Sequence, residues 1–136
     1  MKWIKQRALI MKKILLIDDD QLFLNFLTDY VSERYPNLEI LAFDNALQGL
    51  AHINTDLDLL LLDLEMPDMD GGKLLAYATD KGLDCRRIII LSGRDADYLH
   101  KRFPMGKCLA VLNKHEVRQQ AVLDMIFQAL HKKAEC

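Results

Sequence analysis

The stretch LLLLDLEMPDMDGG, residues 59–72, decides how the chain folds. It opens with four consecutive leucines, Leu59–Leu62, and Pro67 and Gly71-Gly72 follow soon after. Leucine is not a strong strand former, so propensity alone would also allow a helix. The run is short, however, and the nearby helix-breaking residues favour a buried strand. Asp63 then stands directly after the end of this strand.

Four other short apolar runs are predicted to be strands of the same sheet. They are Ile14–Ile17, Leu38–Ala42, Ile88–Leu91 and Leu109–Leu112. Helical patterns separate the runs, and this alternation is typical of a parallel α/β sheet. Right-handed crossovers place helices on both faces of such a sheet. The predicted fold class is therefore α/β, with a doubly wound five-stranded parallel sheet of the (βα)₅ type.

Five helices are expected between and after these strands. The first is expected to turn one apolar face inward and to end before Pro36; that face comprises Leu22, Phe23, Phe26, Leu27, Tyr30 and Val31. The others are expected from about residue 45 to 53 with Asp44 or Asn45 as N-cap, from Gly71-Gly72 to near Gly82, from near Asp95 to before Pro104, and from about Glu116 to Lys132.

The bulk composition excludes several classes of protein. The chain has 136 residues, which fits one domain, and its net charge of −2 argues against a chain that mainly coats nucleic acid. No apolar run approaches the roughly 20 residues that span a bilayer, and the start is not a signal peptide, so a cytoplasmic location is expected. The three cysteines, Cys85, Cys108 and Cys136, are expected to be free thiols, not a disulfide framework or a zinc site.

Polar residues follow four of the predicted strands. Asp18-Asp19-Asp20, Asp63, Ser92-Gly93 and Asn113-Lys114 stand at these positions. Doubly wound sheets bind ligands at the carboxyl ends of their strands, so these residues are expected to meet at one edge. Crowded carboxylates repel one another unless a cation compensates, and Mg²⁺ prefers oxygen ligands of this kind.

This set of residues suits phosphoryl transfer. A carboxylate can accept the group as an aspartyl-phosphate, and Asp63 is the best acceptor because it ends the central run. Mg²⁺, Lys114 and Ser92 would neutralise or bind the phosphoryl oxygens. Taken singly, such an aspartate or serine is often a helix cap and such a lysine a solvated charge. Their shared place at strand ends favours a functional site.

The pattern resembles the receiver domains of two-component response regulators, the CheY-like family, which have a flavodoxin-like fold. The likeness covers about Lys12 to Lys132 and is strongest in residues 14–20, ILLIDDD, and 60–72. Residues 12–132 are therefore predicted to be a receiver domain, with an N-terminal extension at 1–11 and a C-terminal tail at 133–136. A natural start at Met1 or at Met11 remains open.

The resemblance implies a role for each site residue. Asp63 corresponds to the phosphoacceptor, and the metal ligands for Mg²⁺ correspond to Asp18, Asp19, Asp63 and the backbone carbonyl of Glu65. Ser92 and Lys114 match the switch hydroxyl and the lysine that bind the phosphoryl group. The donor would be a sensor histidine kinase or phosphotransfer protein, docking on the helix that starts near Gln21. The resemblance implies a phosphoacceptor that supports its own phosphotransfer and autodephosphorylation, not an enzyme acting on separate substrates.

Three positions depart from the family pattern. Val111 stands where a switch aromatic is usual, so an inward-swinging ring cannot carry the signal. His115 replaces a proline that usually forms a cis bond, and a non-proline cis bond costs about 2.5–4 kcal/mol, so a trans bond is expected. Gly93 replaces a residue that is often alanine and leaves the phosphoryl group more open to water.

The last helix is unusually apolar. Its stripe of Val117, Ala121, Val122, Met125, Ala129 and Leu130 is widened by Leu123, Ile126 and Phe127. It is either a well-buried core helix or one that also forms an interface, as in family members that dimerise through the last two helices and the fifth strand. Direct nucleic-acid binding by this segment is not expected. A stand-alone receiver and a receiver with a separate output domain both fit, and that domain could bind DNA.

Two alternative functions remain open. A pseudo-receiver would bind partners without phosphorylation, which Val111 and His115 favour but the complete acidic set disfavours. A small Mg²⁺-dependent phosphohydrolase would use Asp63 as nucleophile and Glu65 as general acid, although the chain has little length for a substrate pocket.

Overall fold

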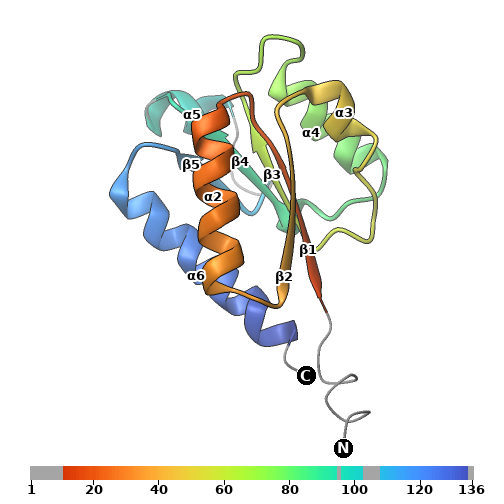
Figure 1. The fold of residues 1–136 in the computed structure, drawn as a ribbon. Helices are drawn as coiled ribbons and strands as arrows, with labels where there is room; N and C mark the ends of the chain where they lie inside the picture. Colours follow the sequence, from red (N-terminus) through yellow and green to blue (C-terminus); the bar gives the residue numbers. More distant parts are fainter. Residues whose placement is uncertain (1–10, 95, 103–107, 135–136) are drawn as a thin grey trace, which may run out of the picture.

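The computed structural model describes residues 11–94, 96–102 and 108–134. Its sheet is parallel, with the order β2-β1-β3-β4-β5, which confirms the predicted doubly wound architecture (Figure 1). The strands are β1 Lys12–Ile17, β2 Leu38–Phe43, β3 Leu59–Asp63, β4 Ile88–Ser92 and β5 Ala110–Asn113.

Helices cover both faces of this sheet. They are α2 Gln21–Arg34, α3 Ala46–Leu50, α4 Gly71–Asp80, α5 Ala96–Arg102 and α6 Val117–Ala134, with a short 3₁₀ turn, η1, at Cys85–Arg87. Helices α2 and α6 lie together on one face, while α3 and α4 lie on the other (Figure 1). The expected limits of α5, a start near Asp95 and an end before Pro104, fall on residues outside the described part of the chain. No described helix is long and apolar enough to span a membrane.

The two covered faces explain why the strands lack hydrophobic alternation. In β1, Leu15 and Ile17 pack into the core beneath α3, α4 and α5, whereas Ile14 and Leu16 pack into the core beneath α2 and α6. Successive side chains point to opposite faces, and here neither face meets water. The central strands β3 and β4 are buried along their whole length.

Local signals set the helix ends. Asp20 and Asp70 cap α2 and α4 through their side-chain oxygens, and Asn45 caps α3. Of the two caps predicted for α3, Asn45 is therefore the one used, and the helix is shorter than expected. A Cβ on Gly71 would lie 2.6 Å from the Leu64 Cα, so only glycine allows α4 to begin this close to the end of β3.

The prediction for the inward face of α2 was partly wrong. Leu22 is 81% exposed and Phe26 is 48% exposed, while Leu24 is buried beside Leu27 and Val31. A helix advances about 100° per residue, so positions spaced by three and four share the buried stripe. The expected set was wider than that stripe and included the solvent side.

Helix α6 is amphipathic, not buried on all sides. Leu123 and Phe127 are buried, and Val122, Ile126 and Leu130 pack partly against the same core. Met125, by contrast, is 70% exposed, and Ala121 and Ala129 are also exposed. The side chain of Val117 lies outside the description. The predicted stripe thus divides into a core face and an outward apolar face.

Candidate functional site

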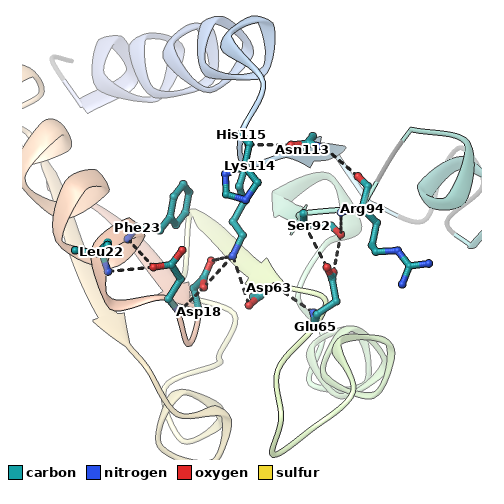
Figure 2. Close-up of polar contacts among 12 residues, drawn as sticks. Asp18, Leu22, Phe23, Asp63, Glu65, Ser92, Arg94, Asn113, Lys114 and His115 are labelled. Atoms are coloured by element: carbon teal, nitrogen blue, oxygen red, sulfur yellow. Dashed lines mark hydrogen bonds and ion pairs between the residues drawn. The ribbon is translucent and has the colours of Figure 1, made fainter.

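Four polar side chains from four different strands meet at the carboxyl edge of the sheet (Figure 2). Asp18 follows β1, Asp63 ends β3, Ser92 ends β4 and Lys114 follows β5. Parallel strands end on the same edge, so the fold itself brings these residues together. Asp18, Asp63 and Ser92 are buried, and burial of the two carboxylates is unusual for charged groups without compensation.

Three carboxylates form a compact cluster. Oxygens of Asp18, Asp19 and Asp63 all lie within 4.8 Å of one another, with Asp19 exposed and the other two buried. The Asp20 N–H donates to Asp18 Oδ1 at 2.8 Å, and the Glu65 N–H donates to Asp63 Oδ1 at 3.1 Å. These backbone donors fix the direction of each buried carboxylate.

Lys114 supplies the positive charge in this cluster. Its Nζ lies 3.0 Å from Asp18 Oδ2 and 3.7 Å from Asp63 Oδ2, and its side chain is only 8% exposed. The Nζ also lies 5.4 Å from the centre of the Phe23 ring. The Lys114 backbone N–H donates to the Ser92 carbonyl at 2.9 Å, which ties the loop after β5 to the end of β4.

The cluster carries more negative charge than Lys114 balances. Burial, followed by the nearby charge of Asp18, raises the pKa of Asp63 to about 7, although Lys114 opposes the shift. Burial likewise raises the pKa of Asp18. For Lys114, burial favours a lower pKa, but the hydrogen bonds and charge of Asp18 outweigh it and the pKa is raised. A set of hard oxygen donors with unbalanced charge, two of its three carboxylates buried, fits Mg²⁺.

The Glu65 side chain points away from the acidic cluster toward the loop after β4 (Figure 2). Ser92 Oγ donates to Glu65 Oε2 at 2.6 Å, and the Gly93 N–H donates to Glu65 Oε1 at 3.3 Å. The Arg94 N–H in turn donates to Ser92 Oγ at 2.9 Å. The sequence placed Glu65 near the site, but it contained no signal for this contact.

Asn113 was expected at this edge but had no assigned role, and in the structure it joins the two loops beside the site. Its Nδ2 donates to the Arg94 carbonyl at 3.0 Å, and its Oδ1 accepts the His115 N–H at 2.8 Å. Its position at the end of β5, directly before Lys114, was the available signal. The loop after β5 is thus held to the loop after β4 by side-chain as well as backbone contacts.

The structure also shows the surroundings of the three positions that depart from the family pattern. Val111 is half-buried against the core that includes Tyr98 of α5. The described residues contain no cis peptide bond, so the bond before His115 is trans, as expected. A Cβ on Gly93 would lie 3.7 Å from His115 Nε2, an ordinary contact distance, so alanine would fit at this position.

Comparison with known proteins identifies the family of this chain. The sequence profile of the response regulator receiver domain matches residues 14–127. The chain belongs to this family. Relatives of the receiver domain include the glycerol metabolism activator of Pseudomonas putida, 41% identical over 124 residues, which cover 89% of this chain and 55% of that protein. The two-component response regulator ARR10 of Arabidopsis thaliana is 28% identical over 124 residues, covering 90% and 22%.

The structural comparison agrees. A CheY-like receiver domain protein from Methanospirillum hungatei JF-1 superimposes with a TM-score of 0.67 and 27% identity, covering 90% of this chain and 98% of that one. The receiver domain spans about half of the Pseudomonas relative and about a fifth of the Arabidopsis relative.

Proposed function

We propose that this receiver domain is a phosphorylation-dependent switch of a two-component system. An oxygen of the Asp63 carboxylate attacks the phosphorus of a phosphohistidine, the N–P bond breaks and the donor histidine leaves. The supporting observation is the buried Asp63 carboxylate, which is oriented by the Glu65 N–H and lies close to Asp18, Asp19 and Lys114. On this proposal the domain is a phosphoacceptor and does not act on separate substrates.

Mg²⁺ is the proposed cofactor. Asp18, Asp19, Asp63 and the backbone carbonyl of Glu65 would hold it, consistent with the crowded carboxylate oxygens. When bound, the ion neutralises charge on the phosphoryl group and on the acidic cluster. Lys114 would contribute the remaining positive charge to a phosphoryl oxygen once its contact with Asp63 is replaced.

The output is proposed to be a change in the surface formed by α5, β5 and α6. Ser92 would bind a phosphoryl oxygen, and its movement would displace Arg94, whose N–H donates to Ser92 Oγ. The Arg94 guanidinium lies 4.1 Å from the centre of the Tyr98 ring in α5, so this motion reaches that helix. Tyr98 would therefore change position when Arg94 moves, so an aromatic residue would respond to phosphorylation although Val111 has no ring.

The proposed donor is a sensor histidine kinase or phosphotransfer protein that docks on α2. The exposed side chains of Leu22 and Phe26 are apolar surface for such a contact. Beside them, an apolar pocket lined by Phe23, Phe26, Tyr30 and Leu123, among others, extends to Lys114. A partner on this surface would therefore reach the phosphorylation site.

Other features of the protein's cellular role are also proposals. Met125 and Leu109 expose apolar surface on α6 and just before β5, which supports a homodimer through α5, β5 and α6. A cytoplasmic location fits the two-component role. We do not propose direct nucleic-acid binding by the receiver itself; a stand-alone receiver and a receiver joined to a DNA-binding output domain both fit the proposal.

The test is intact mass after incubation with Mg²⁺ and a small acyl phosphate, with wild type beside Asp63→Asn. A single added phosphoryl group on the wild type alone is expected. No addition to either protein, with Mg²⁺ binding established separately, would favour the phosphorylation-independent pseudo-receiver. Turnover of an exogenous phosphate ester would instead favour the phosphohydrolase.

A further inference from the structure

Both carboxylate oxygens of Glu65 accept hydrogen bonds from the loop after β4. Oε2 accepts from the Ser92 hydroxyl at 2.6 Å and Oε1 accepts from the Gly93 N–H at 3.3 Å. Hydrogen bonds to a charged acceptor are shorter and stronger than those between neutral groups. The loop that contains Ser92, the proposed switch residue, is therefore hydrogen-bonded to the segment that follows Asp63.

This contact uses the hydrogen that Ser92 would need for the phosphoryl group. A serine hydroxyl has one hydrogen to donate, and here Glu65 accepts it. The hydroxyl oxygen already accepts from the Arg94 N–H. Ser92 can therefore donate to a phosphoryl oxygen on Asp63 only after it has left Glu65.

We propose that the Glu65 carboxylate is a positioning group that holds Ser92 in the resting state and releases it when Asp63 becomes phosphorylated. The inference rests on the proposed function and adds a resting-state contact to it. Two anions, the Glu65 carboxylate and the phosphoryl group, compete for one hydroxyl. Such competition gives the loop two discrete positions, as a switch requires.

The charge of the phosphoryl group provides the force for release. Glu65 is tied by its backbone N–H to Asp63 Oδ1 at 3.1 Å, so new negative charge on Asp63 arises next to this residue. A phosphoryl group adds about −1.5 to −2 charge at neutral pH. Like charges at short range disfavour the resting arrangement, and the same group offers Ser92 a new acceptor. Phosphorylation therefore weakens the old contact and creates its replacement.

The position of Glu65 makes the proposal testable by substitution. The residue is exposed, whereas Asp63 and Ser92 are buried, so its replacement leaves the core intact. Glu65→Ala removes both contacts. Glu65→Gln keeps an acceptor for Ser92 but loses the charge, and its amide nitrogen cannot accept from Gly93. Glu39→Gln, at an exposed position in β2, is the matched control for loss of one glutamate charge.

The first measurement is amide hydrogen exchange of Gly93 and Arg94 in the unphosphorylated protein. Glu65→Ala is expected to speed exchange about tenfold, the scale of one charge-assisted hydrogen bond, with Glu65→Gln between it and the wild type. Glu39→Gln should match the wild type. Unchanged exchange in Glu65→Ala would overturn the proposal.

The second measurement separates the contact from a simple charge effect. Affinity for beryllofluoride with Mg²⁺, a phosphoryl mimic, is measured for wild type, Glu65→Ala, Ser92→Ala and the double variant. Glu65→Ala is expected to raise affinity about tenfold when Ser92 is present and much less when Ser92 is replaced. Equal effects in both backgrounds would mean that Glu65 acts only by charge and would overturn the inference.

The two proposals fail in different ways. If the wild type accepts a phosphoryl group normally but the Glu65 variants behave like wild type in both measurements, the switch stands and the Glu65 inference is wrong. If the wild type accepts no phosphoryl group, both are wrong, because release has no trigger.

Discussion

The site has two halves that differ in burial and in how they are held. In the acidic half, Asp18, Asp63 and Lys114 are almost wholly buried and form ion pairs between strand ends. In the other half, the exposed Glu65 holds a loop through hydrogen bonds to Ser92 and Gly93. Burial magnifies every charge in the first half, while water screens the carboxylate of the second. The first half is therefore suited to chemistry and the second to motion.

The largest expected effect comes from removing the cation of the buried half. Lys114→Met leaves Asp18 and Asp63 buried without their ion-pair partner, and loss of one partner of a buried pair costs about 3–5 kcal/mol. Urea unfolding without divalent cations would measure the loss. A change below about 1 kcal/mol would show that water or protonation of the carboxylates, whose pKa values are raised, already compensates the missing cation.

Removing the Asp63 carboxylate from the same half is expected to have the opposite effect on folding stability, an increase. Burial, then the charge of Asp18, raises the folded-state pKa of Asp63 to about 7, above its ordinary value near 4. Ionisation thus costs folded stability as the pH rises from about 4 through 7. Asp63→Asn should stabilise the metal-free protein by about 2 kcal/mol at pH 8.

The control for that variant is pH itself. At pH 5 the folded wild type keeps Asp63 mostly protonated, so the gain from Asp63→Asn should shrink. Urea unfolding at the two pH values tests this. Equal gains at both would mean that ionisation of Asp63 is not the source of the instability.

Mg²⁺ should reverse the same penalty. Binding to the native state alone stabilises by about 1–3 kcal/mol when Mg²⁺ is at roughly ten to a hundred times its Kd. Thermal unfolding of the wild type should therefore shift upward with added Mg²⁺, and Asp63→Asn should shift less because it lacks a proposed ligand. Equal shifts would remove Asp63 from the proposed metal site.

The sequence predicted the acidic half of the site well, but it did not predict the hydrogen bonds of Glu65 in the other half. Strand ends follow from apolar runs, so the meeting of Asp18, Asp63, Ser92 and Lys114 at one edge could be foreseen without coordinates. The direction of the Glu65 side chain could not, because an exposed glutamate has many rotamers and its partner lies 27 residues away. Leu22 was misplaced for a related reason: the spacing of apolar residues indicates a helical face but not how wide the buried part of that face is.

The smallest expected effect on stability lies at Glu65, and it sharpens the contrast between the halves. Glu65 is exposed, and water can reach the groups that its removal frees, so Glu65→Ala should cost only about 1–1.5 kcal/mol in urea unfolding, the scale of a tenfold change. Yet the same substitution is expected to change loop exchange and phosphoryl-mimic affinity about tenfold. A loss as large as that for Lys114→Met would mean that Glu65 holds the fold together instead of setting the position of a loop. A small loss, together with the expected changes in loop exchange and mimic affinity, would show that Glu65 sets the position of the loop while the buried half keeps its structure.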